Sequence, residues 1–282
     1  MKVKITPGLI IKFIVLSVLS IIFLIPFIYM ISISLASPRT NYMSAFTIIP
    51  REFHIQNYLD MFKNSALIYW IKNSIILTVV NLIFTLASCS LVAYAFARLR
   101  ARGKNIIFMV LLSTMMIPTQ VTLIPQFVIF RKLGWINTML PLIIPNLFGS
   151  PFYIFLLRQF IMRLPNSLDE AAKIDGLGYF GIYRKIVLPL IKPGLASVAV
   201  LTVIANWGWF FEPKIYLNKT EKYPLAVGVQ ILSTTGNVGE AQMWNIAFAA
   251  AMLLVIPMII LYFAGQKYMF EISINAGSDA IK

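Results

Sequence analysis

The chain contains six uncharged, apolar stretches that are each long enough to cross a lipid bilayer. A membrane-spanning helix needs about 20 consecutive apolar residues. The stretches cover residues 13–35, 73–97, 105–130, 133–157, 193–211 and 241–266. Only 12% of the 282 residues are charged, and the mean hydropathy is +0.82, whereas about 25% of a soluble domain is charged. We therefore predict an all-α integral membrane protein with six transmembrane helices.

The first apolar stretch is expected to be a retained helix. It is longer than the core of a signal peptide, which has about 7 to 15 residues, and no small-residue cleavage pattern follows it. The predicted layout is an amino-terminal transmembrane helix (1–35), an external loop (36–66), a five-helix membrane domain (67–266) and a cytoplasmic tail (267–282).

The net charge of +14 is explained by membrane topology. Loops on the cytoplasmic side of a membrane are enriched in Lys and Arg. With both termini in the cytoplasm, most Lys and Arg fall on that side, most densely in the turn Arg98–Lys104. This orientation also places the charged segment 161–192 in the cytoplasm. Nucleic-acid binding is not needed to explain the charge.

Segment 161–192 predicts two short helices joined by a turn. Pro165 should end the preceding span, and Ser167 with Glu170 three residues later matches a capping box. Gly176 and Gly178 can turn the chain. Leu188-Pro189 should stop the second helix before the next span. An ordinary amphipathic connector at the membrane surface has similar features and stays open as an alternative.

The same segment fills every fixed position of a known pattern: Glu170-Ala171-Ala172, three residues, Gly176, nine residues, then Ile186-x-Leu188-Pro189. It resembles the EAA loop of the permease subunits of bacterial ABC importers. The resemblance implies the type I ABC importer permease fold, with this loop as the helix that couples to the ATPase. The implied coupling residues are Asp169, Glu170, Ala171, Ala172, Asp175, Gly176, Ile186, Leu188 and Pro189.

The resemblance also implies roles for these residues. Glu170 would anchor the loop to the ATPase, Ala171 and Ala172 would allow close contact, and Gly176 would form the hinge. Gly176→Asp or Glu170→Lys should then abolish transport in a protein that still inserts.

The chain is most similar to the maltose- and glycerol-3-phosphate-type sugar permeases, including an Asn57-Tyr58 pair before the second span. The implied function is uptake of a carbohydrate, an oligosaccharide, across the bacterial inner membrane. The implied partners are a second homologous permease, an ABC ATPase dimer, an extracytoplasmic sugar-binding protein and membrane lipid. ATP and Mg would be bound by the ATPase, and no cofactor is expected in this chain.

Polar and aromatic residues inside the spans are candidates for the substrate pathway. Prolines in the third and fourth spans favour bends that open a cavity, or static kinks. The cluster at the end of the fifth span can stack on sugar rings, although Trp207 and Trp209 also suit a membrane-interface belt. The candidate pathway residues are Gln120, Asn146, Asn206, Trp207, Trp209, Phe210 and Glu212.

The motifs that the sequence lacks limit its function. It has no phosphate-binding loop of the G-x-x-x-x-G-K-[ST] type. Cys89 and His54 are the only cysteine and histidine, so they supply no metal cluster. We therefore expect a transport subunit without its own ATPase activity. Alternatives are a permease for an amino acid, peptide or phosphate, a membrane enzyme acting on lipid-linked sugars, and an assembly or sensor protein.

Overall fold

The computed structural model describes residues 7–37, 49–50, 52–63, 65–234 and 244–278. These residues form helices, with one isolated antiparallel bridge between Ala36 and Phe53. The chain divides into two compact units, one of residues 1–67 and 228–255 and the other of residues 68–227 and 256–282. Each unit is described by itself.

The first unit contains α1 (Pro7–Ser34), α2 (Gln56–Asp60) and the 3₁₀ turn η1 (Met61–Lys63). Asn57 is buried and holds this unit together, because its Nδ2 donates to the carbonyls of Ser34 and Ala36, both at 2.9 Å. Its Oδ1 accepts from Asn245 Nδ2 at 2.8 Å. The Asn57-Tyr58 pair of the sequence is therefore a structural junction at the end of α1.

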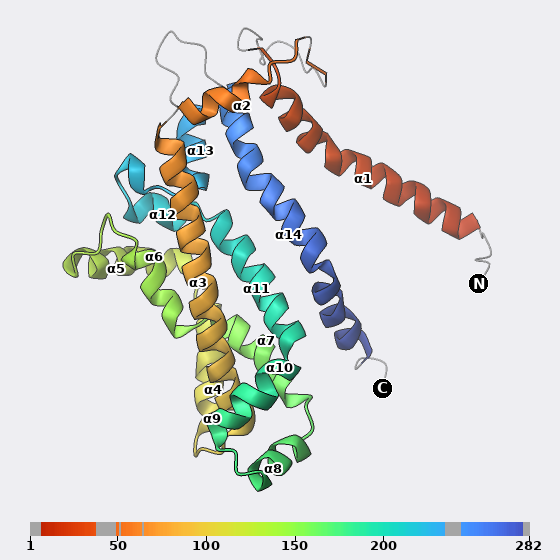
Figure 1. The fold of residues 1–282 in the computed structure, drawn as a ribbon, viewed down its shortest axis with the longest axis vertical. Helices are drawn as coiled ribbons and strands as arrows, with labels where there is room; N and C mark the ends of the chain where they lie inside the picture. Colours follow the sequence, from red (N-terminus) through yellow and green to blue (C-terminus); the bar gives the residue numbers. More distant parts are fainter. Residues whose placement is uncertain (1–6, 38–48, 51, 64, 235–243, 279–282) are drawn as a thin grey trace. The chain divides into compact units, whose positions relative to one another are not determined.

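The second unit contains most of the helices (Figure 1). Those wholly inside it are α4 (Lys104–Ser113), η2 (Thr114–Met116), α5 (Thr119–Lys132), α6 (Leu140–Ile143), η3 (Ile144–Phe148), α7 (Pro151–Met162), α8 (Ser167–Ile174), α9 (Tyr179–Ile182), η4 (Tyr183–Val187), α10 (Leu188–Leu190), α11 (Lys192–Trp207), α12 (Phe211–Tyr216) and η5 (Thr220–Lys222). Three helices have residues in both units: α3 (Ser65–Arg98), α13 (Leu225–Thr234) and α14 (Trp244–Ser278).

Four helical segments among the described residues are long and apolar enough to cross a membrane: Pro7–Ser34, Ala66–Arg98, Leu140–Met162 and Trp244–Gln266. Two bent pairs can each supply one more span. The six predicted spans correspond to these four helices and two pairs. The sixth helix continues past the predicted end of the membrane domain, since α14 runs to Ser278.

The third predicted span is not one straight helix. Lys104–Met116 and Thr119–Lys132 meet at 96°. Pro118 causes the break, because Ile117 before it is extended (φ −82°, ψ 115°), as the residue preceding a proline tends to be. Pro125, in contrast, lies inside α5 without ending it. In the fourth span the prolines stand at helix starts, for example Pro151 at the first residue of α7.

The core of the second unit lies between α3, α7, the α9–α10 segment and α11. Its largest fully buried side chains include Leu157, Ile161, Ile182 and Ile191. A buried amide pair adds a polar contact, since Asn81 Nδ2 of α3 donates to Asn206 Oδ1 of α11 at 2.6 Å and to the carbonyl of Leu142 at 3.1 Å. This core fixes the end of α3, beside which the candidate site lies.

Candidate functional site

Helix α8 begins one residue earlier than the predicted capping box requires. Ser167 is already helical, and Asn166 is the N-cap. The carbonyl of Asn166 accepts from the backbone N–H of Asp169 at 3.0 Å and of Glu170 at 3.2 Å, and no side chain caps the helix. The capping-box prediction is therefore wrong. Its physical reason is that the Asn166 side chain instead accepts a hydrogen bond from Arg98.

The predicted turn after α8 is confirmed at Gly176. This residue has φ +80°, a conformation that is costly for residues with a Cβ atom. The backbone N–H of Gly176 donates to Lys173 O at 3.0 Å, and that of Leu177 donates to Ala172 O at 2.9 Å. These two bonds form a Schellman motif, which satisfies the last carbonyls of the helix. Gly178, in contrast, has an ordinary negative φ of −74°.

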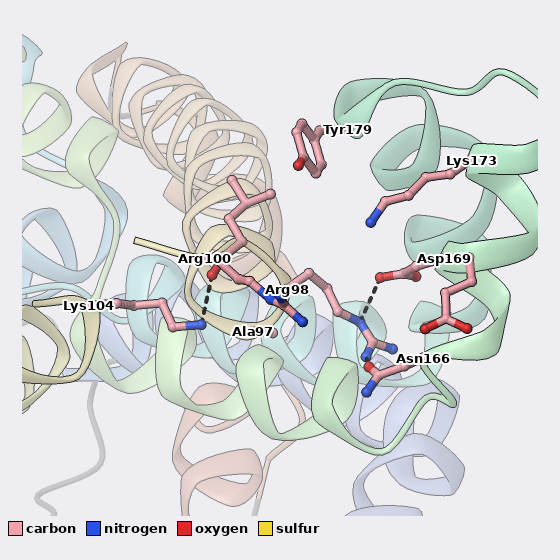
Figure 2. Close-up of a pocket in the computed structure, with 10 residues that line it drawn as sticks. Ala97, Arg98, Arg100, Lys104, Asn166, Asp169, Lys173 and Tyr179 are labelled. Atoms are coloured by element: carbon pink, nitrogen blue, oxygen red, sulfur yellow. Dashed lines mark hydrogen bonds and ion pairs between the residues drawn. The ribbon is translucent and has the colours of Figure 1, made fainter. Parts of the chain in front are cut away.

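Arg98 at the end of α3 clamps the start of α8 (Figure 2). Its Nε lies 3.3 Å from Asp169 Oδ2, and both side chains are mostly buried, with 7% and 13% exposed. Its Nη2 donates to Leu164 O at 2.7 Å, and its Nη1 donates to Asn166 Oδ1. Asp169, predicted to contact an ATPase, is thus already engaged inside the chain.

The two faces of α8 differ in exposure. Asp169 and Ala172 lie on the face turned to the rest of the unit, where Ala172 is 2% exposed and belongs to the core. At 100° per residue, Ala171 and Ile174 lie on the opposite side of the helix. Glu170 lies close to Ile174 around the helix and is exposed, and it also borders the polar cavity between α8 and α3. Ile174 is 87% exposed. The small side chain of Ala172 therefore allows α8 to pack closely against the core of its own unit. The outward face is the one that a partner can contact.

The second helix of the loop packs firmly on the second unit. Tyr183 OH lies 2.7 Å from Ser90 Oγ, and Tyr94 OH donates to Tyr179 O at 3.1 Å. Ile186 and Leu188 pack against the core. The pattern residues Ile186 and Leu188 therefore have a packing role in this unit.

The helix that carries these residues includes one π-helical turn, Tyr183–Val187. Pro189 is exposed within its last turn, and the helix ends at Leu190, one residue later than predicted. The chain then bends by 77° into α11. Asp175, the C-cap of α8, is exposed.

A polar cavity of about 640 Å³ separates α8 from the end of α3 and the start of α4. Arg100 and Lys173 line it, as does Lys104, whose Nζ donates to Leu99 O at 2.8 Å. Lys173 Nζ also lies 5.7 Å from the centre of the Tyr179 ring. The cavity on the Asp169 side of α8 is therefore lined by several Arg and Lys side chains.

Two of the predicted pathway residues are brought together by the fold. Gln120 at the start of α5 and Glu212 of α12 line one cavity of about 210 Å³. Trp209 Nε1 donates to Glu212 Oε2 at 2.6 Å, which orients the carboxylate. Phe210 lies apart from this cavity and stacks under Lys214, whose Nζ is 5.2 Å from the ring centre.

The other predicted pathway residues lie elsewhere. Asn146 donates to Leu142 O at 3.1 Å within its own helical segment. Asn206 is buried. Its Oδ1 accepts from Asn81 Nδ2, and its Nδ2 donates to the carbonyl of Thr202. Trp207 borders a separate apolar pocket, where its buried Nε1 has no hydrogen-bond partner among the described residues. The seven candidates therefore do not form one site.

The sequence did not predict the residue that fixes the start of α8 or the most exposed apolar residue on its outward face. Arg98 was assigned only to a basic turn, and nothing local in the sequence predicts its contact with Asn166 and Asp169, 68 and 71 residues later. Ile174 could have been found, since it is an apolar residue on the polar side of a short amphipathic helix. No group of three or more His, Cys, Asp or Glu that could hold a metal ion occurs among the described residues.

Comparison with known proteins identifies the family. The model of the family "binding-protein-dependent transport system inner membrane component" matches residues 89–270. The chain belongs to this family. The match includes the whole coupling loop and all of the helices from α4 to α13.

Individual relatives cover most of the chain. It is 32% identical over 236 residues to the arabinooligosaccharides transport system permease protein AraQ of Halalkalibacterium halodurans, covering 82% of each chain. It is 31% identical to the trehalose/maltose transport system permease protein MalG of Thermococcus litoralis, covering 92% of each. A chain of the bacterial ABC transporter that imports the acidic polysaccharide alginate is 27% identical, with a TM-score of 0.83 over 92% of this chain and 95% of that one.

These relatives confirm several sequence predictions. The chain has the ABC importer permease fold and is an inner-membrane transport subunit. The relatives are transport permeases and not enzymes, so the alternative of a membrane enzyme acting on lipid-linked sugars is excluded.

Proposed function

We propose that the chain is the transmembrane permease subunit of an ATP-driven importer that takes up a carbohydrate, specifically an oligosaccharide delivered by an extracytoplasmic binding protein. The names of the relatives AraQ and MalG, which are permeases for arabinooligosaccharides and for trehalose and maltose, support the substrate class. The family description, a binding-protein-dependent transport system, supports the delivery step.

The outward face of α8 is proposed to be the docking surface for the ATPase. The observation that carries this proposal is Ile174, an isoleucine that is 87% exposed in a charged segment outside the apolar spans. Burying such a side chain against a partner contributes about 2 kcal/mol. Glu170 on the same face supplies a charge for a basic group of the partner, while Asp169 and Gly176 set the position and the end of the helix.

The complete importer is proposed to contain a second, homologous permease and an ABC ATPase dimer, with ATP and Mg bound by the ATPase. Both termini of this chain would lie in the cytoplasm. The Lys and Arg that gather around α8 support this orientation: Arg98, Arg100, Lys104 and Lys173 line the same cavity, and cytoplasmic loops are enriched in these residues.

Uptake by whole cells tests the proposed substrate class. Cells lacking this chain are complemented with it and given radiolabelled arabino-oligosaccharides, malto-oligosaccharides and a set of amino acids. We expect uptake of an oligosaccharide to depend on the chain and on ATP. Chain-dependent uptake of an amino acid without any saccharide uptake would refute the carbohydrate assignment.

Co-purification tests the docking surface. The tagged chain is isolated from native membranes, and the co-purifying ATPase is quantified for the wild type and for Glu170→Lys. Glu221→Lys is the matched control, since Glu221 is also exposed but lies in η5, far along the chain from the loop. We expect Glu170→Lys to lose the ATPase and the control to retain it. Equal recovery with both variants would contradict docking through α8.

A further inference from the structure

A cavity of about 210 Å³ lies between the first residues of α5 and the first residues of α12. It lies at the break of a membrane span, because α5 begins directly after Pro118, where the chain turns by 96°. Non-helical backbone inside a bilayer occurs where it is covered by protein or lines a water-filled cavity. The break therefore indicates a position where polar backbone groups are covered by protein or face a cavity.

Two helices lead into this cavity, and both are short compared with a bilayer. Lys104–Met116, which precedes the break, is about 20 Å long at the usual rise per residue. Helix α11 (Lys192–Trp207) is about 24 Å long before the chain leaves it towards α12. The hydrocarbon core of a bilayer is about 30 Å thick. Each helix is therefore too short to cross the hydrocarbon core by itself, and the cavity is lined by the first residues of α5 and α12, which follow these two helices in the chain.

The chemistry of the cavity combines one strong acceptor with several donors. Glu212 supplies a carboxylate, and Trp209 engages its Oε2 at 2.6 Å. Thr119 and Gln120 supply a hydroxyl and an amide from the start of α5, and Leu123 and Phe211 complete the wall with apolar surface.

A sugar ring matches this combination. Each hydroxyl group can donate to the carboxylate and accept from an amide or hydroxyl, and the C–H faces of the ring suit an apolar wall. A carboxylate without a cation in the cavity lining disfavours a ligand that is itself negatively charged. The lining residues include no Lys, Arg or His.

We propose that this cavity is a sugar subsite contributed by this subunit, and that it takes one ring of a neutral saccharide in preference to a uronic acid. The inference rests on the proposed carbohydrate import and adds a location and a charge preference to it. It therefore predicts a preference opposite to that of the related importer of the acidic polysaccharide alginate.

Direct binding to the assembled importer tests the subsite. The complex is placed in lipid nanodiscs without binding protein, and saturation-transfer NMR measures binding of maltotriose, arabinotriose and trigalacturonate at millimolar concentration. The wild type is compared with Glu212→Gln, which keeps an oxygen acceptor for Trp209, and with Gln120→Ala. Glu221→Gln removes an exposed carboxylate outside the cavity and serves as the matched control.

We expect the wild type to bind a neutral trisaccharide and to exclude trigalacturonate. Both cavity variants should weaken neutral binding by about tenfold, as loss of a hydrogen bond to a charged group does, and Glu212→Gln should admit trigalacturonate. The control should match the wild type. Equal binding of both sugar classes by the wild type, or unchanged binding by both cavity variants, overturns the proposal.

Uptake measurements separate the two levels of inference. If the wild-type importer takes up no saccharide at all, the proposed function fails and the subsite fails with it. If saccharide uptake is present but Glu212→Gln and Gln120→Ala leave both binding and uptake unchanged, only the subsite is refuted.

Discussion

Removal of the Arg98 charge tests whether α8 is held in place by an ion pair. In the variant Arg98→Met the long apolar stem is kept and the charge is lost. Asp169, 13% exposed, then remains as a mostly buried carboxylate without its cation. The carbonyl of Leu164 and the amide oxygen of Asn166 lose their donors as well.

The size of the effect follows from the geometry. At the 3.3 Å separation of Nε and Oδ2, an effective dielectric constant of about 20 gives an attraction of about 5 kcal/mol. Desolvation of the two groups offsets part of this attraction, but stranding one partner of a buried pair costs several kcal/mol. We therefore expect local stability of α8 to fall by about 3 kcal/mol, which corresponds to about 100-fold faster amide exchange.

Hydrogen–deuterium exchange of the α8 backbone in the purified importer measures this change. Arg102→Met removes a charge from the same turn at an exposed position and should leave exchange unaltered. The double variant Arg98→Met/Asp169→Asn should exchange about tenfold more slowly than Arg98→Met alone, because it no longer strands a carboxylate. Exchange of Arg98→Met within threefold of the Arg102→Met control would refute the argument.

Three further predictions concern the coupling loop and its support. Gly176→Ala should lower the free energy of unfolding by about 1 kcal/mol, because the φ of +80° is strained for alanine. The added Cβ itself has no atom within 4 Å, so no clash contributes. Gly178→Ala, with a negative φ and equal space, should leave the free energy of unfolding unchanged. Gly265→Ala places a Cβ atom 2.6 Å from Val200 Cγ2 and should cost about 1 to 3 kcal/mol in unfolding experiments, and the additional change Val200→Ala should restore most of it. Ile174→Ser should weaken co-purification of the ATPase about tenfold or more without changing thermal stability, since the side chain is 87% exposed; a parallel loss of stability would contradict a surface role.

The sequence predicts the fold class because long apolar stretches can be accommodated only in a membrane. It also predicts the two short helices and the turn of segment 161–192, since Gly176 must turn the chain where α8 ends, and the structure shows the positive φ that the turn requires. Span ends are less predictable. The stretch 105–130 contains no charge to mark the break after Met116, and one proline, Pro118, ends a helix while Pro125 does not.

The contacts of individual site residues could not be predicted, because they depend on packing between segments distant in the sequence. Asp169 and Glu170 are adjacent and chemically alike, yet one pairs with Arg98 and the other faces outward. Asn206 and Glu212 both looked like pathway residues. The distance of 2.6 Å from Asn81 assigns Asn206 to the core, and only Glu212 remains in a cavity.

The structure also shows how a force on α8 can reach the cavity. Arg98 joins α8 to the end of α3, and the helix Tyr179–Leu190 joins the loop to α11 through the bend at Ile191. Packed helices move as rigid bodies rather than deforming continuously. We therefore expect a displacement of α8 to be transmitted to both α3 and α11, and α11 ends next to the helix that carries Glu212. If an ATPase docks on α8 as proposed, movement of α8 and access to the proposed sugar subsite would be linked within one subunit.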